Sequence, residues 1–91
     1  MPTRTVAIAS AVGLHARPAA IFVKQAASAP VEVLIAKAGS DEEPVDAASI
    51  LGVMALGAKH GEQVVLSADG DGADAVLDEL VALLSRDLDA E

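Results

Sequence analysis

The segment "ARPAAIFVKQAAS" (residues 16–28) has the clearest helical pattern in the chain. Pro18 falls in its first turn, where the N–H that proline lacks would have no helical acceptor. Pro30 follows the segment and marks a break. Apolar residues recur at the spacing of one helix face, at Ala19, Phe22, Val23 and Ala26. The segment therefore predicts an amphipathic helix over residues 16–28 with one buried face.

The stretches on either side of this helix predict the remaining elements. Alternating or short apolar runs favour four strands, at Thr3–Ser10, Val31–Lys37, Val45–Asp46 and Glu62–Ala68. A polar, acidic stretch predicts a loop over residues 38–44. Two further helices are expected, at Ser49–Leu56 with Ser49 as N-cap, and at residues 73–86 with Asp71 as cap.

The predicted order is β-α-β-β-α-β-α within 91 residues, which indicates one domain spanning residues 1–91. Strand pairs separated by helices in so short a chain favour an α+β two-layer domain. In that arrangement, a four-stranded antiparallel sheet is covered on one face by three helices. A chain of this length buries enough surface to fold without disulfides or metals.

Composition excludes several classes of protein. The absence of cysteine excludes a disulfide scaffold, a thiolate zinc site and a thiol nucleophile. A single Phe, no Trp or Tyr and a net charge of −8 argue against nucleic acid as a partner. No apolar run is long enough to cross a membrane, and no signal peptide is evident, so we expect a soluble cytoplasmic protein.

Charge is distributed unevenly along the chain. Residues 1–40 carry four basic and one acidic side chains, a net charge of +3. Residues 41–91 carry two basic and thirteen acidic side chains, a net charge of −11. The cationic part of the chain is thus the part that contains His15.

The stretch "GLHARPAA" (residues 13–20) combines groups that suit an anion. The N–H groups of Ala16 and Arg17 open the predicted helix and carry the positive end of its dipole. Gly13 lets the preceding loop turn tightly, and Arg17 offers a fork of donors for phosphoryl oxygens. The same positive potential is expected to lower the pKa of His15 and keep its imidazole nucleophilic. His15 has no second ligand at metal spacing, so no metal is expected. From these residues alone, a phosphoryl-carrying histidine and a capping histidine remain equally open.

The predicted helix at residues 49–56 is apolar on every side. A helix on one face of a sheet cannot bury its whole circumference. Part of this helix is therefore expected to stay exposed as a partner patch.

"GLHARPAA" resembles the active-site signature of the HPr family, the histidine-containing phosphocarriers of the bacterial sugar phosphotransferase system. A second block, "SILGVMALGAKHGEQV" (residues 49–64), is similar to the family's segment around its regulatory serine. The resemblance covers nearly the whole chain and implies an open-faced sandwich of four antiparallel strands and three helices. It also implies a carrier that is not itself an enzyme, works as a monomer and needs no cofactor.

The resemblance further implies roles for individual residues. His15 matches the residue that takes a phosphoryl group on Nδ1 from enzyme I, itself charged by phosphoenolpyruvate, for transfer to sugar-specific enzyme II A domains. Arg17 matches the arginine that assists transfer. Ser49 matches the serine that a dedicated kinase phosphorylates in some bacteria, with a phosphorylase and transcription regulators as further possible partners. The implied partner-binding residues are Ala20, Lys24, Leu51, Gly52 and Met54.

Two departures from the family pattern concern regulation rather than His15. Ala48 stands where the family commonly has lysine, and the loop Ala38–Pro44 is longer and more acidic than the usual turn. Both weaken the expectation that a kinase regulates Ser49.

Three other functions remain as alternatives. A regulatory carrier in a nitrogen-related or signalling branch would use the same His15 chemistry with other acceptors. A small hydrolase would bind an acyl phosphate through Arg17, yet residues 13–20 offer no second polar group to orient water. A non-catalytic interaction module would use His15 only as a capping residue.

Overall fold

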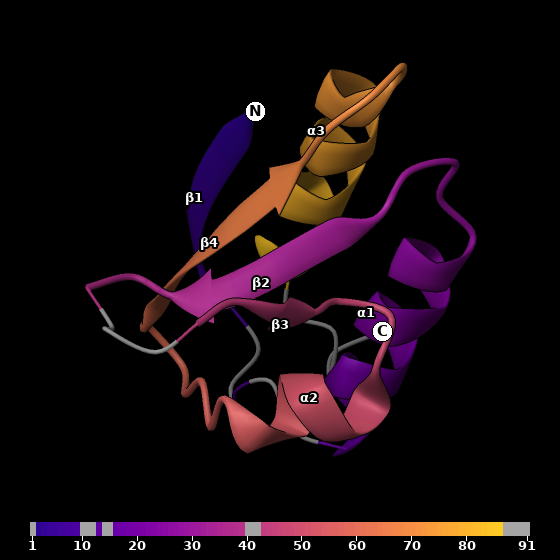
Figure 1. The fold of residues 1–91 in the computed structure, drawn as a ribbon. Coiled ribbons are helices and arrows are strands. Elements are labelled where there is room, and N and C mark those ends of the chain that lie inside the picture. Colours follow the sequence, from indigo (N-terminus) through magenta and orange to yellow (C-terminus); the bar gives the residue numbers. More distant parts are fainter. Residues whose placement is uncertain (1, 10–12, 14–15, 40–42, 87–91) are drawn as a thin grey trace.

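The computed structural model describes residues 2–9, 13, 16–39 and 43–86 (Figure 1). The order of elements matches the sequence prediction. They are β1 (Thr3–Ala7), α1 (Ala16–Ala27), β2 (Val33–Lys37), β3 (Val45–Asp46), α2 (Ile50–Ala55), β4 (Gln63–Ala68) and α3 (Ala73–Leu84).

The four strands form one open antiparallel sheet in the order β1-β4-β2-β3. β4 lies between β1 and β2, with Val6 opposite Val64 and Ile35 opposite Leu66. These four side chains are buried. They lie on one face, because alternate residues of a strand face the same side of its sheet. The register therefore builds one apolar sheet face.

The helices cover that apolar face and leave the other open. α3 packs on β1 and β4, α1 packs against α3, and α2 packs against α1 and β3 (Figure 1). Phe22 of α1 and Leu77 and Leu80 of α3 are almost completely buried in the core. On the opposite sheet face, Ala36 and Val65 are half-buried. The expected α+β open-faced sandwich is confirmed.

An ion-pair cluster fastens the edge strand β1 to α3. Arg4 Nη2 lies 3.0 Å from Asp74 Oδ1, and Arg4 Nε lies 3.1 Å from Asp78 Oδ1. Hydrogen bonds to these two carboxylates raise the pKa of Arg4 above its ordinary value. The pairs are exposed to solvent, so salt weakens them.

The predicted cap of α3 is wrong. Gly72, not Asp71, occupies the N-cap position, and no side chain caps this helix. The φ angle of Gly72 is +86°, a left-handed conformation that glycine adopts without strain. The chain thus enters α3 through backbone geometry rather than through a side-chain hydrogen bond.

Several predicted boundaries shift by one to three residues, the largest shift being at the end of β1, which is Ala7 rather than the predicted residue 10. α1 ends at Ala27 and α3 at Leu84, and β2 begins at Val33. At the end of α3, Ser85 Oγ donates to the Val81 carbonyl at 2.6 Å. The same carbonyl also accepts from the Ser85 N–H at 2.9 Å, so the Ser85 hydroxyl shares it with the backbone at the end of α3.

Candidate functional site

Helix α1 begins at Ala16, the residue directly after His15. His15, on which the sequence prediction centres, lies outside the described residues. The first turn of α1 contains no acidic side chain. N–H groups in the first turn of a helix have no acceptor within that helix and favour an anion. The N–H groups of Ala16 and Arg17 lie in this first turn, and their binding of a phosphoryl group stays a prediction.

One face of α1 exposes three of the predicted site residues. Arg17, Ala20 and Lys24 are exposed, and their spacing places them along one side of the helix. Phe22 and Ala26 are buried on the other side. We call Arg17, Ala20 and Lys24 the basic stripe of α1.

Gly13 is buried and has a φ angle of +76°. Glycine adopts this left-handed conformation without strain, whereas the neighbours that would complete the predicted tight turn lie outside the described residues. A methyl group on Gly13 would lie 2.7 Å from the Ala58 carbonyl oxygen and 2.8 Å from Lys59 Cα. Glycine is thus required at position 13 for two reasons. Its φ angle is one that other residues rarely adopt, and another segment of backbone lies too close for a side chain.

The backbone that Gly13 contacts leads into a turn from Lys59 to Glu62, which Glu62 closes. The Lys59 N–H donates to Glu62 Oε1 at 2.8 Å, and the Glu62 N–H donates to the Lys59 carbonyl at 3.0 Å. Glu62 Oε2 also lies 3.4 Å from Lys37 Nζ. The hydrogen bond from the Lys59 N–H, together with the charge of Lys37, lowers the pKa of Glu62 below its ordinary value. The sequence analysis did not single out Glu62, because no pattern in the neighbouring residues predicts that its carboxylate closes this turn.

Ser49 caps helix α2, as predicted. Its hydroxyl oxygen accepts a hydrogen bond from the Gly52 N–H at 3.2 Å. Its carbonyl accepts the first helical bond from the Val53 N–H at 2.9 Å. Both predicted positions, Ser49 and Gly52, are half-buried at the start of this helix.

Helix α2 leaves apolar side chains exposed, as predicted. Leu51 is 80% exposed and Met54 37%, whereas Val53 is fully buried. Ile50 is also 37% exposed, and the sequence analysis did not count it among the partner-binding residues. Ile50 lies four residues before Met54 and therefore on the same face of the helix, which could have predicted its exposure. We call Ile50, Leu51 and Met54 the apolar patch of α2. Because α2 packs against α1, this patch belongs to a helix adjacent to the basic stripe.

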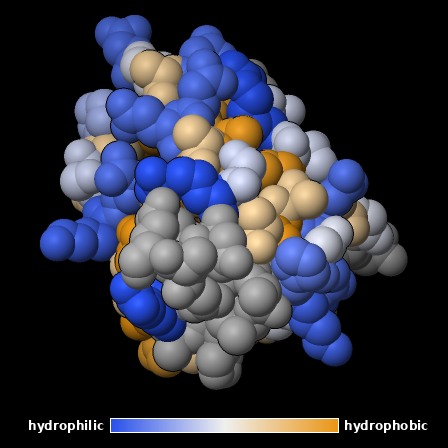
Figure 2. All heavy atoms as spheres, turned by 180° about the vertical axis from the view of Figure 1, so that it is seen from behind, coloured by the Kyte–Doolittle hydropathy of each residue, from blue (hydrophilic) through white to orange (hydrophobic). Residues whose placement is uncertain are grey.

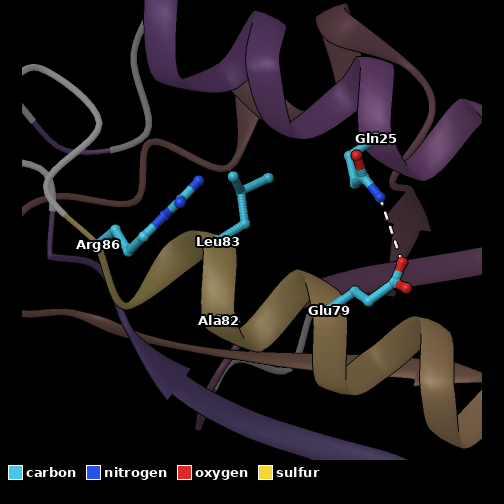
Figure 3. Close-up of a pocket in the computed structure, with 5 residues that line it drawn as sticks. All are labelled: Gln25, Glu79, Ala82, Leu83 and Arg86. Atoms are coloured by element: carbon cyan, nitrogen blue, oxygen red, sulfur yellow. Dashed lines mark hydrogen bonds between the residues drawn. The ribbon is translucent and has the colours of Figure 1, made fainter. Parts of the chain in front are cut away.

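A shallow pocket of about 280 Å³ lies between α1 and α3 (Figure 3). Gln25 of α1 faces Glu79 of α3, and Gln25 Nε2 donates to Glu79 Oε2 at 3.3 Å. Ala82, Leu83 and Arg86 complete the lining. Figure 2 shows the side of the molecule opposite to Figure 1, where hydrophilic side chains surround a group of hydrophobic side chains right of the centre.

The described part of the chain contains neither a candidate metal site nor a candidate membrane span. No group of three or more His, Cys, Asp or Glu residues there could hold a metal ion. None of the helices described is long and apolar enough to cross a membrane.

Comparison with known proteins gives consistent matches. Residues 2–86 match the family model "PTS HPr component phosphorylation site". The chain is 49% identical to the phosphocarrier protein HPr of Streptomyces coelicolor, over 98% of this chain and 94% of that protein. It is 46% identical to the phosphocarrier protein HPr of Haloferax volcanii, over 90% of this chain and 91% of that protein.

A solved structure agrees with these matches. The crystal structure of HPr-C-His from Thermoanaerobacter tengcongensis has a TM-score of 0.82 and 39% sequence identity. The alignment covers 92% of this chain and 91% of that one. The fold and these matches thus define the class of protein, a small phosphocarrier. The chain belongs to the HPr family, the phosphocarriers of the phosphotransferase system.

Proposed function

We propose that the protein accepts one phosphoryl group on Nδ1 of His15 from phosphorylated enzyme I and passes it to sugar-specific enzyme II A domains. The observation that carries this proposal is the start of α1 directly after His15, with no acidic side chain in its first turn. Family membership supports the same chemistry.

In the accepting step, the lone pair of His15 Nδ1 attacks the phosphorus atom of the donor. The N–P bond forms while the bond from phosphorus to the donor breaks, and the donor keeps that electron pair. The N–H groups of Ala16 and Arg17 bind the transferred oxygens, and the Arg17 guanidinium stabilises the charge in transit. Transfer to the acceptor is the same displacement with His15 as leaving group.

Each protein molecule takes one phosphoryl group as the substrate of enzyme I and gives it up as the donor to the acceptor, so it acts as a stoichiometric carrier rather than an enzyme. All the groups used are its own side chains and backbone, and no cofactor is required. We expect it to work as a cytoplasmic monomer.

The basic stripe of α1 and the apolar patch of α2 form the proposed docking surface for both partners. Lys24 and Arg17 provide attraction for acidic groups, and Leu51 and Met54 provide apolar area at the centre. Gly52 has only a hydrogen atom and Ala20 only a methyl group beyond the backbone, which allows a partner to approach the two helices closely. Ser49, at the start of α2, is the proposed site of regulatory phosphorylation.

The test is incubation with radiolabelled phosphoenolpyruvate, magnesium and enzyme I, followed by separation from the donor. The carrier hypothesis predicts an acid-labile label that persists without an acceptor and is lost when an enzyme II A domain is added. Release of inorganic phosphate without any acceptor would favour a hydrolase instead. Failure to take up the label would contradict the proposed function.

A further inference from the structure

The backbone of Ala58–His60 forms the surface on which Gly13 rests. Ideal Cβ geometry at Gly13 brings that atom 2.7 Å from the Ala58 carbonyl oxygen and 3.3 Å from the His60 nitrogen. Because these distances are too short for a carbon atom, the two backbones leave no space for a side chain at position 13. The path of the chain at Gly13, two residues before His15, therefore depends on where this turn lies.

Glu62 holds the turn at both ends. Its carboxylate accepts from the Lys59 N–H at 2.8 Å, and its own N–H donates to the Lys59 carbonyl at 3.0 Å. Gly57 precedes the turn and Gly61 lies within it, with φ angles of +63° and +85°. Glycines give a chain wide conformational freedom, so the turn depends on such hydrogen bonds to keep one conformation.

The same residue ties the turn to the strand that leads toward His15. The Ile8 N–H donates to the Glu62 carbonyl, and the Gly61 N–H donates to the Ile8 carbonyl, each at 2.9 Å. One residue further on, the Ala9 N–H donates to the Leu84 carbonyl at 3.1 Å. The chain is thus held before Gly13 at Ile8 and Ala9, and at Gly13 by the turn.

We propose that Glu62 is a positioning residue for phosphoryl transfer, because its carboxylate fixes the turn that supports Gly13 and thereby sets the presentation of His15. This inference rests on the proposed function of His15. Lys37 contacts the other carboxylate oxygen at 3.4 Å, but both side chains are partly exposed, and solvent screens the pair. The hydrogen bond to the Lys59 N–H is also exposed, but at 2.8 Å it is the shorter of the two carboxylate contacts and the one made to the turn itself.

A positioning role affects transfer and docking differently. Transfer needs the nucleophile aligned with the phosphorus atom, and small misplacements slow it strongly. Docking is proposed to use exposed side chains of α1 and α2. The Glu62 carboxylate contacts Lys59 and Lys37, which lie outside both helices. Loss of the carboxylate should thus lower the kcat of enzyme I with this protein as its substrate and leave the KM for this protein unchanged.

The test compares Glu62→Ala with Glu62→Gln, whose amide oxygen still accepts from the Lys59 N–H. We expect Glu62→Ala to lower kcat for phosphoryl acceptance by about tenfold, with KM within about twofold of wild type. Glu62→Gln should keep kcat within about threefold of wild type. Glu32→Ala, which removes the same charge at an exposed position before β2, is the matched control and should transfer normally.

Hydrogen exchange of the Lys59 N–H gives a readout independent of transfer. It should be faster in Glu62→Ala and close to wild type in Glu62→Gln. Wild-type kcat in Glu62→Ala despite faster exchange would overturn the inference. So would a raised KM at unchanged kcat, or an equal loss of kcat in both variants.

Gly13→Ala tests the same contact from the other side if Glu62→Ala does not fold. Its added methyl group must displace the turn, so kcat should fall at unchanged KM. A folded Gly13→Ala with wild-type kcat would overturn the inference. Wild-type protein that accepts no phosphoryl group would overturn the proposed function as well, whereas normal transfer by Glu62→Ala overturns only the role of Glu62.

Discussion

The hydroxyl oxygen of Ser49 accepts a hydrogen bond from the Gly52 N–H at 3.2 Å, which makes Ser49 the N-cap of α2. The same helix exposes Leu51 and Met54. Stability and docking thus respond differently to a negative charge at position 49. The charge complements the start of a helix but enters the proposed docking surface.

Ser49→Asp should leave the free energy of unfolding unchanged or raise it by no more than about 1 kcal/mol, since Asp caps helices as well as Ser does. Phosphoryl acceptance from enzyme I should be much slower, because the new charge must lose water on docking beside Leu51. Denaturant unfolding and a transfer assay on the same preparation check both expectations.

Ser49→Ala is the control for the cap. It should lower the free energy of unfolding by about 1 kcal/mol and leave transfer nearly normal. Unimpaired transfer by Ser49→Asp would place Ser49 outside the docking surface.

Leu51→Asp should fold normally and transfer poorly. Leu51 is 80% exposed, so a charge there remains in water in the free protein and must be desolvated only in the complex. Val53→Asp is the contrasting variant, because its buried position would hold an unpaired charge, at a loss of about 3–5 kcal/mol. Thermal melts detect the loss of stability expected for Val53→Asp. The KM of enzyme I for each variant detects the loss of docking expected for Leu51→Asp. Normal transfer by Leu51→Asp would remove the apolar patch of α2 from the docking surface.

Arg17→Ala should lower kcat more than it raises KM, because the guanidinium is proposed to stabilise charge on the transferring group. Lys24→Ala lies on the same stripe but farther along α1, and it should mainly raise KM. Steady-state transfer kinetics on both variants, at one ionic strength, make the comparison. Equal effects of Arg17→Ala on kcat and KM would assign Arg17 to docking instead.

The lowered pKa of Glu62 predicts a pH-dependent contribution to stability. Its carboxylate is stabilised in the folded protein, so the contribution is present above the unfolded pKa of about 4.5 and is lost as pH falls through the lower folded value. The melting temperature of wild type should therefore exceed that of Glu62→Gln by a constant amount above about pH 5.5. The difference should shrink as pH falls below that range. A difference that does not change with pH would contradict this assignment.

The features that the sequence predicted well are local ones. The strands containing Val33 and Ile35, or Val64 and Leu66, follow from alternation along a few residues. The cap at Ser49 likewise joins residues three apart. The exposure of Leu51 follows from a short helix that is apolar on every side.

The features that were missed depend on contacts between distant segments. The support of Gly13 by Ala58–His60 is a contact between backbones, which leaves no pattern of side chains to detect. The pairing of Arg4 with Asp74 and Asp78 requires β1 to lie along α3. At the start of α3, a local rule favoured Asp71, but the left-handed turn at Gly72 makes a side-chain cap unnecessary.

The most direct test of the central claim is the mass of the intact protein after incubation with phosphoenolpyruvate, magnesium and enzyme I, for wild type and His15→Ala in parallel. Circular dichroism first establishes that both are equally folded. The account predicts one added phosphoryl group on wild type, which disappears after acid treatment, and none on His15→Ala. A folded His15→Ala that gains the same phosphoryl group, or a wild type that gains none, would contradict it.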